Sequence, residues 1–188
     1  MYKDESGKPV DATMFKSLIG GLRYLVHMRP DNFYAVGLVS RFMERPRLLH
    51  LNAVKHILRY IKGTIDYGLI YSRGSRFHML VGFFDSNFAG SCEDRKSTGG
   101  MAFCLNENLI TWVSQKQRCV ALSTCEAEFM AATAAMCQSM WLQKLLSHIT
   151  DIRPEPVTLF INNRSAIDLV KNPVFHGRSK HIDVRYHC

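Results

Sequence analysis

The spacing of apolar residues changes near residue 65. This change divides the chain into a helical region followed by a region that contains strands. Before it, apolar residues recur every three or four positions, as they do along one face of a helix. Three helices are predicted there, over 13–25, 31–43 and 49–62. After it, β-branched and aromatic runs bounded by glycine predict strands. We therefore expect a helical segment over 1–72 and an α/β domain over 73–188.

The second part alternates strands and helices in an order that constrains its fold. The predicted elements are strands at 65–71, 77–85, 99–105 and 109–114, a helix at 124–146, a strand at 157–161 and a helix at 165–171. A hairpin turn joins the strands at 99–105 and 109–114. Because one strand returns after a long helix, the order predicts an α/β domain with a mixed sheet.

Charge and composition narrow the class of protein. The chain of 188 residues has 24 Lys and Arg against 16 Asp and Glu, a net charge of +8. This surplus favours a polyanionic partner, either nucleic acid or an anionic membrane surface. The six cysteines have no C-x-x-C spacing, which favours reduced thiols. The apolar runs are shorter than a membrane span, and the start has no signal region. We expect an intracellular protein, cytoplasmic or nuclear, with no membrane partner.

The helix predicted at 49–62 carries a basic stripe. Lys55, Arg59 and Lys62 lie at helical spacing and share one face. Contact with phosphate and a solvated helix face both explain the stripe, since runs of charge are weak signals.

Polar residues follow two predicted strands. Asp85 comes after the hydrophobic run at 80–84, and Asn162 follows the run at 157–161. A carboxylate at the end of a central strand can project into a metal site. Alternatively, Asp85 is an ordinary turn residue, and Asn162 belongs to a turn and helix cap, a role that asparagine performs well.

Two glutamates lie in the first turns of the long predicted helix. Glu126 and Glu128 are two positions apart, so they cannot share a helix face. Glu128 lies on the small-residue face with Ala132 and Ala135, and it is the better candidate to reach the strand that ends in Asp85. Glu126 is expected to serve the helix N-terminus, where negative charge is favoured, and this is also the alternative role for Glu128.

Several motifs occur in the order of one known family. They include HILRYIKGT (56–64), DRKSTGG (94–100), STCEAEF (123–129) and RSKHIDVRYH (178–187). With them, the chain resembles the C-terminal part of the Pol polyprotein of copia-type LTR retrotransposons. Residues 1–72 resemble the end of the reverse transcriptase, and 73–188 resemble a ribonuclease H (RNase H) domain. The resemblance implies an RNase H-like mixed sheet with flanking helices, whose last strand and helix would lie beyond Cys188.

The resemblance also implies an acidic metal site. Asp85 and Glu128 fall on two family acids that hold Mg²⁺, or Mn²⁺, and Asn162 stands where the family has a third Asp. The family's fourth acid would lie beyond the C-terminus, with Asp183 as an alternative. Two carboxylates hold a pair of dications poorly, because asparagine brings no charge. We therefore expect an inactive or nearly inactive enzyme.

The implied substrate is an RNA–DNA hybrid, whose RNA strand the family hydrolyses during reverse transcription. Hybrids are recognised through their backbone and groove shape. Candidate contacts come from basic and polar residues near the predicted site and in the C-terminal tail: Lys96, Ser114, Lys116, Gln117, Arg178, Lys180 and Arg185. A diffuse basic surface without a groove is the alternative. Other partners are other nucleic acids and the rest of a Pol polyprotein. A second function remains open, a host-retained, non-enzymatic module that binds nucleic acid or protein.

Overall fold

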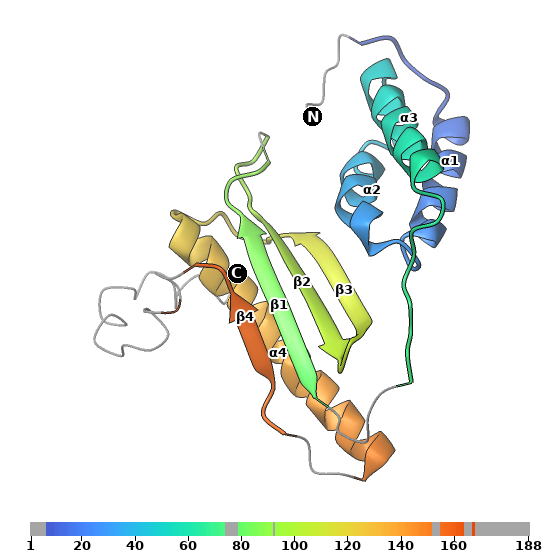
Figure 1. The fold of residues 1–188 in the computed structure, drawn as a ribbon. Coiled ribbons are helices and arrows are strands. Elements are labelled where there is room, and N and C mark those ends of the chain that lie inside the picture. Colours follow the sequence, from blue (N-terminus) through green and yellow to red (C-terminus); the bar gives the residue numbers. More distant parts are fainter. Residues whose placement is uncertain (1–6, 74–78, 92, 152–154, 164–166, 168–188) are drawn as a thin grey trace. The chain divides into compact units, whose positions relative to one another are not determined.

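The computed structural model describes residues 7–73, 79–91, 93–151, 155–163 and 167 (Figure 1). The chain divides into two compact units, Met1–Ile70 and Tyr71–Cys188, called here the first and second units. The helix predicted at 165–171 falls outside the described residues except for Ile167, which is helical. The described part of the chain has no helix long and apolar enough to cross a membrane.

Three α-helices build the described part of the first unit, residues 7–70. They are α1 (Ala12–Leu25), α2 (Phe33–Ser40) and α3 (Leu48–Gly63), with the short 3-10 helix η1 (Pro30–Asn32) before α2. The carboxylate of Asp11 starts α1 by accepting from the N–H of Thr13 at 2.9 Å. The buried core combines apolar side chains from all three helices, among them Phe15, Ile19, Val36, Val39, Val54 and Ile57. The predicted helices are therefore present, although α2 ends at Ser40 rather than at residue 43.

A buried arginine joins the α1–α2 connection to the end of α3. Arg29 is 4% exposed, and its Nε and Nη2 donate to the two carboxylate oxygens of Asp31 at 3.0 and 2.8 Å. The same guanidinium donates to the carbonyl and hydroxyl oxygens of Thr64 at 2.9 and 2.7 Å. The rings of Tyr60 and Tyr67 lie 5.8 and 5.9 Å from its Cζ. The planar, five-donor guanidinium therefore has partners on several sides.

The prediction of a strand at 65–71 is wrong. Residues 64–66 form a turn, and 67–73 have irregular backbone. Ile65, Ile70 and Tyr71 are 78%, 89% and 59% exposed. High β propensity yields a strand only where a neighbouring strand accepts its ladder, and none of the four described strands pairs with this segment.

The sheet of the second unit is mixed, as predicted, and has four strands among the described residues. Its strands are β1 (Leu80–Asn87), β2 (Thr98–Leu105), β3 (Asn108–Lys116) and β4 (Thr158–Ile161), in the order β3-β2-β1-β4. The first three are antiparallel neighbours, whereas β4 is parallel to β1. The connection to β4 runs through α4 (Thr124–Thr150), which lies along one face of the sheet in Figure 1. The fold is thus α/β, as expected for an RNase H-like domain.

The core of the second unit lies between α4 and this face. It contains Leu80, Phe84, Phe103, Ala131, Ala132, Ala135 and Leu142. The alanines let the helix approach closely, and Gly82 does the same within the sheet. A Cβ on Gly82 would lie 2.6 Å from side-chain atoms of both Leu159 and Phe103. Close packing therefore explains the glycine at this position.

Candidate acidic site

The sheet brings Asp85 and Asn162 to the same edge. Phe84 of β1 pairs with Ile161 of β4 in parallel register. Asp85 and Asn162 each follow directly, so they are neighbours at the carboxyl ends of two parallel strands. Both side chains are exposed. A group bound at this edge can therefore reach both of them from solvent.

The start of α4 separates the roles of its two glutamates. The Ser123 hydroxyl accepts from the N–H of Glu126 at 3.1 Å, and the Glu126 carboxylate accepts from the N–H of Leu122 at 2.7 Å. Glu126 therefore serves the helix start. Glu128 lies on the buried face of α4, and its carboxylate meets β1.

Asp85 and Glu128 share one backbone donor. The N–H of Ser86 lies 2.9 Å from Asp85 Oδ1 and 3.2 Å from Glu128 Oε1. Glu128 is 6% exposed, and its Oε2 is buried without a hydrogen-bond partner among the described residues, as is the Oγ of Ser86. The structure thus brings two of the three predicted site residues to one backbone donor.

The surroundings of Glu128 shift its pKa. Burial, followed by the hydrogen bond with Asp85, raises the pKa of the Glu128 carboxyl, and the Ser86 N–H opposes the shift. Two adjacent carboxylates repel each other when both are ionised. The pair therefore favours holding a proton or a cation between its members.

The donors at this edge fit a metal ion in kind. Asp85 and Glu128 offer carboxylate oxygens and Asn162 offers an amide oxygen, which are ligands that Mg²⁺ prefers. Glu128 Oε2, which has no hydrogen-bond partner among the described residues, can serve as a ligand for a cation. In the part of the chain that the structure describes, no three His, Cys, Asp or Glu side chains gather closely enough to hold a metal. The set therefore suits one cation better than the two of a two-metal centre.

A row of paired residues extends from this edge across the sheet. Asp85 pairs with Gly100 of β2, and Gly100 pairs with Ser114 of β3. Directly paired residues of antiparallel strands point to the same face. Gly100 has no side chain, so the sheet is open between Asp85 and the half-buried Ser114. Ser114, a predicted contact, therefore lies on the same face as Asp85.

The other predicted contacts have different surroundings. Lys116 Nζ lies 2.7 Å from a carboxylate oxygen of Asp94, and the N–H of Lys96 donates to the same oxygen at 3.3 Å. Gln117 ties β3 to α4, because its Nε2 donates to the carbonyl of Ala127 at 2.8 Å. Arg178, Lys180 and Arg185, together with Asp183, lie outside the described residues. Lys96 and Lys116 are thus the predicted cations that the structure places near this end of the sheet.

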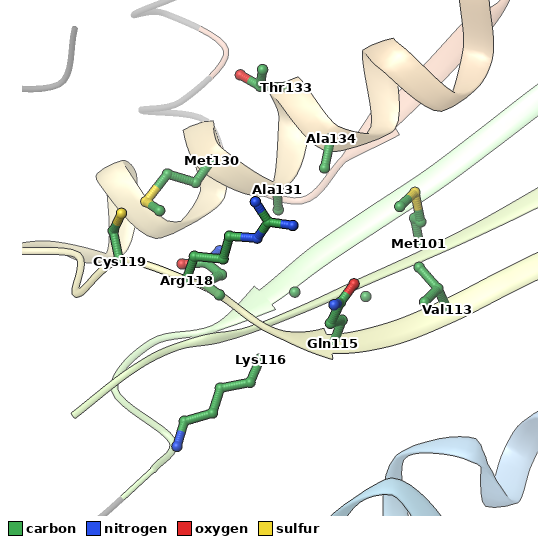
Figure 2. Close-up of a pocket in the computed structure, with 13 residues that line it drawn as sticks. Met101, Val113, Gln115, Lys116, Arg118, Cys119, Met130, Ala131, Thr133 and Ala134 are labelled. Carbon is green, nitrogen blue, oxygen red and sulfur yellow. The ribbon is translucent and has the colours of Figure 1, made fainter. Parts of the chain in front are cut away.

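A cleft of about 350 Å³ lies between β2, β3 and α4 (Figure 2). Its lining is mostly apolar and includes Met101, Val113, Met130, Ala131 and Ala134, with Arg118 as a cation. Figure 2 shows the Lys116 side chain extending away from the cleft. Sequence reasoning missed this cleft because three separate elements form its walls. Val113 and Gln115 lie two positions apart on β3 and therefore share the face that lines the cleft.

Sequence relatives identify the family. The chain is 43% identical over 174 residues to the retrovirus-related Pol polyprotein from transposon TNT 1-94 of Nicotiana tabacum, covering 92% of the chain and 13% of that protein. It is 37% identical over 180 residues to the corresponding polyprotein from transposon RE1 of Arabidopsis thaliana, covering 96% of the chain and 12% of that protein. The chain belongs to the copia-type, retrovirus-related Pol polyproteins of transposons. It spans about an eighth of the length of these two Pol polyproteins.

A shorter relative, most of which aligns with the chain, carries another name. The secreted RxLR effector protein 161 of Plasmopara viticola is 43% identical over 129 residues, which are 68% of this chain and 90% of that protein. No family model matches the chain. No solved structure matches it either.

Proposed function

We propose that the second unit is a retrotransposon-derived RNase H-like domain that binds RNA–DNA hybrids and has lost most of its hydrolytic activity. The observation that carries the proposal is that Asp85 and the buried Glu128 accept from the same backbone N–H, that of Ser86, near the carboxyl end of β1. Asn162 beside them explains the loss, because it keeps an oxygen ligand and removes a charge. Membership of the Pol family supports the substrate class.

Each of the three residues has a defined part in this proposal. Asp85 and Glu128 would hold Mg²⁺, with the Asn162 carbonyl as a third ligand. A bound ion supplies charge stabilisation to the reacting phosphate. Ser86 orients both carboxylates through its N–H, and burial of Glu128 keeps its Oε2 unsolvated. Replacing a carboxylate by an amide weakens the attraction for the dication, which lowers both occupancy and catalysis.

The open face of the sheet supports hybrid binding. Gly100 leaves room for a backbone between Asp85 and Ser114, and Lys116 supplies positive charge on the same face. Contacts of this kind are made to phosphates and not to base edges. Binding should therefore weaken steeply with salt and show no base specificity.

The experiment that tests this function is cleavage of an RNA–DNA hybrid in Mg²⁺ and in Mn²⁺. The unmodified chain should show little or no cleavage, Asn162→Asp should restore it, and Asp85→Ala added to that variant should abolish it again. Mg²⁺-dependent cleavage by the unmodified chain, lost in Asp85→Ala, would refute the inactivity. Absence of cleavage by Asn162→Asp, despite an unchanged circular dichroism spectrum, would show that Asn162 is not the cause of the lost hydrolytic activity.

The second candidate is a non-enzymatic binding module. The observation that favours it is the Plasmopara viticola effector protein, 90% of whose length aligns with the chain at 43% identity. Such a module would keep the fold and the basic surface without needing a third acid. Capture of nucleic acid by the chain, undiminished in Asp85→Ala and without cleavage in Asn162→Asp, would favour it over an impaired enzyme.

A further inference from the structure

Three hydrogen-bond donors surround the carboxylate of Asp94. This group of donors, from Lys116, Lys96 and Ser91, is called the seat. Lys116 Nζ lies 2.7 Å from Oδ1, the N–H of Lys96 donates to the same oxygen at 3.3 Å, and the Ser91 hydroxyl also donates to the carboxylate. These donors hold the pKa of Asp94 well below its usual range, with Lys116 contributing most. The arrangement therefore stabilises an anion at this point of the surface.

The loop that carries the seat is fixed by its own hydrogen bonds. The N–H of Arg95 donates to the Ser91 carbonyl at 2.8 Å, and the N–H of Ser91 donates to the Lys96 carbonyl at 3.1 Å. Ser97 is fully buried, and its carbonyl accepts from the N–H of Gln117 at 2.8 Å, which fastens the loop to the end of β3. The donors are thus held in place, whereas the Asp94 side chain is 40% exposed.

The seat lies on the same face of the sheet as Asp85, the face opposite to the one that α4 covers. Lys116 pairs with Thr98, and Thr98 pairs with Asn87, two residues beyond Asp85 on β1. Side chains two apart on a strand share a face, so Lys116 emerges on the side of Asp85. Two strand spacings separate β3 from β1, about 10 Å, which is the rise of about three nucleotides. A nucleic-acid strand that passes Asp85 can therefore reach the seat with a neighbouring phosphate.

We propose that this seat binds a backbone phosphate of nucleic acid, and that Asp94 occupies it until the phosphate displaces the carboxylate. The proposal rests on the proposed binding of hybrids and adds to it a phosphate subsite with a built-in competitor. Lysine binds phosphate as a point charge, and a serine hydroxyl and a backbone N–H are ordinary phosphate donors. An ion pair exposed to solvent is weak, so a phosphate can displace the carboxylate. Asp94 therefore lowers the affinity for nucleic acid.

The test is the affinity for a fluorescently labelled RNA–DNA hybrid, measured by anisotropy in EDTA. Asp94→Asn should bind about fivefold more tightly than the unmodified chain, the size of effect expected for one exposed charge contact. The control is Glu107→Gln in the turn between β2 and β3, at the other end of the sheet, which makes the same change in net charge. It should change the affinity less than about twofold, because distant exposed charges are screened. In the Lys116→Ala background, Asp94→Asn should give no gain.

The outcomes separate the subsite from the function beneath it. Equal affinities of Asp94→Asn and Glu107→Gln for the hybrid would contradict the phosphate subsite while leaving hybrid binding in place. Tighter binding by Asp94→Asn that persists in the Lys116→Ala background would contradict it as well. Failure of every form, including the unmodified chain, to bind the hybrid would overturn the proposed function itself. Inorganic phosphate, compared with chloride at equal ionic strength, distinguishes the two sources of phosphate. The tighter hybrid binding of Asp94→Asn should persist when inorganic phosphate is added. If phosphate but not chloride removes this gain in affinity, the seat binds free phosphate instead.

Discussion

A buried charged residue in each unit, Arg29 in the first and Glu128 in the second, can be compared, and the surroundings of the two differ. Arg29 in the first unit is 4% exposed and donates to both carboxylate oxygens of Asp31 and to two oxygens of Thr64. Glu128 in the second unit is 6% exposed, has a carboxylate neighbour, and leaves Oε2 without a partner among the described residues. A buried charge with a full set of partners holds a fold together. A buried charge beside a like charge costs stability and is typical of a functional site.

The pKa shifts of the two carboxyl groups have opposite signs. The hydrogen bond from Arg29 lowers the pKa of Asp31, so its contribution to stability is present above the ordinary value of 3.8 and is lost as the pH falls. Burial raises the pKa of Glu128, so its contribution is present below the ordinary value of 4.5 and is lost as the pH rises through the folded value. At neutral pH, Asp31 therefore stabilises the first unit, whereas Glu128 destabilises the second.

The largest effect is expected from breaking the Arg29 cluster. Arg29→Ala removes the donors of Asp31 and Thr64 and should lower the unfolding midpoint of the first unit by about 10 °C or more. The measurement is thermal unfolding combined with hydrogen exchange of peptides from α1, α2 and α3. Arg23→Ala, at an exposed position on α1, is the control and should shift the midpoint by no more than about 2 °C. Equal shifts would mean that the cluster does not hold this unit together.

A smaller effect is expected from overpacking the second unit, which depends on packing rather than on its acids. Gly82→Ala places a methyl group 2.6 Å from side-chain atoms of Leu159 and Phe103, and it should destabilise the unit by about 1–3 kcal/mol. Gly100→Ala is the matched control, because the nearest atom to its Cβ is the Val113 carbonyl oxygen at 3.8 Å. Urea unfolding of the two variants measures the difference. A smaller loss in Gly82→Ala than in Gly100→Ala would contradict the packing described here.

The smallest effect, and the one with opposite sign, is expected at Glu128. Glu128→Gln keeps the acceptor for Ser86 and removes a buried charge, so it should raise the unfolding midpoint at pH 7 in EDTA by about 2–5 °C. The gain should shrink as the pH falls toward 4.5, because the glutamate then becomes protonated. Glu126→Gln is the comparison, since Glu126 serves the helix start. A pH-independent loss of stability in Glu128→Gln would show that Glu128 is an ordinary structural residue.

Local pattern predicted most of the elements, and long-range pairing explains the rest. Helical spacing was enough to choose Glu128 over Glu126 as the glutamate that faces β1. Strand endings marked Asp85 and Asn162 individually, but their place at one edge follows from the parallel pairing of β1 with β4. The strand expected at 65–71 failed because propensity carries no information on whether a partner strand exists. The acceptors of Arg29 on Thr64 lie 35 residues away in the chain, and Asp94 meets Lys116 only through the β2–β3 hairpin. Such contacts follow from the fold and not from spacing.

The central claim is that Asn162 removes a charge that the Asp85–Glu128 site needs to bind its metal ion tightly. The most direct measurement is calorimetric titration of Mn²⁺ and Mg²⁺ into the unmodified chain, Asn162→Asp, and Asn162→Asp with Asp85→Ala. The account predicts that Asn162→Asp binds the ion about tenfold or more tightly than the unmodified chain, since one added charge in contact with a dication is worth at least about 1.4 kcal/mol. Adding Asp85→Ala should remove that gain. Equal affinities for the unmodified chain and Asn162→Asp would contradict the claim.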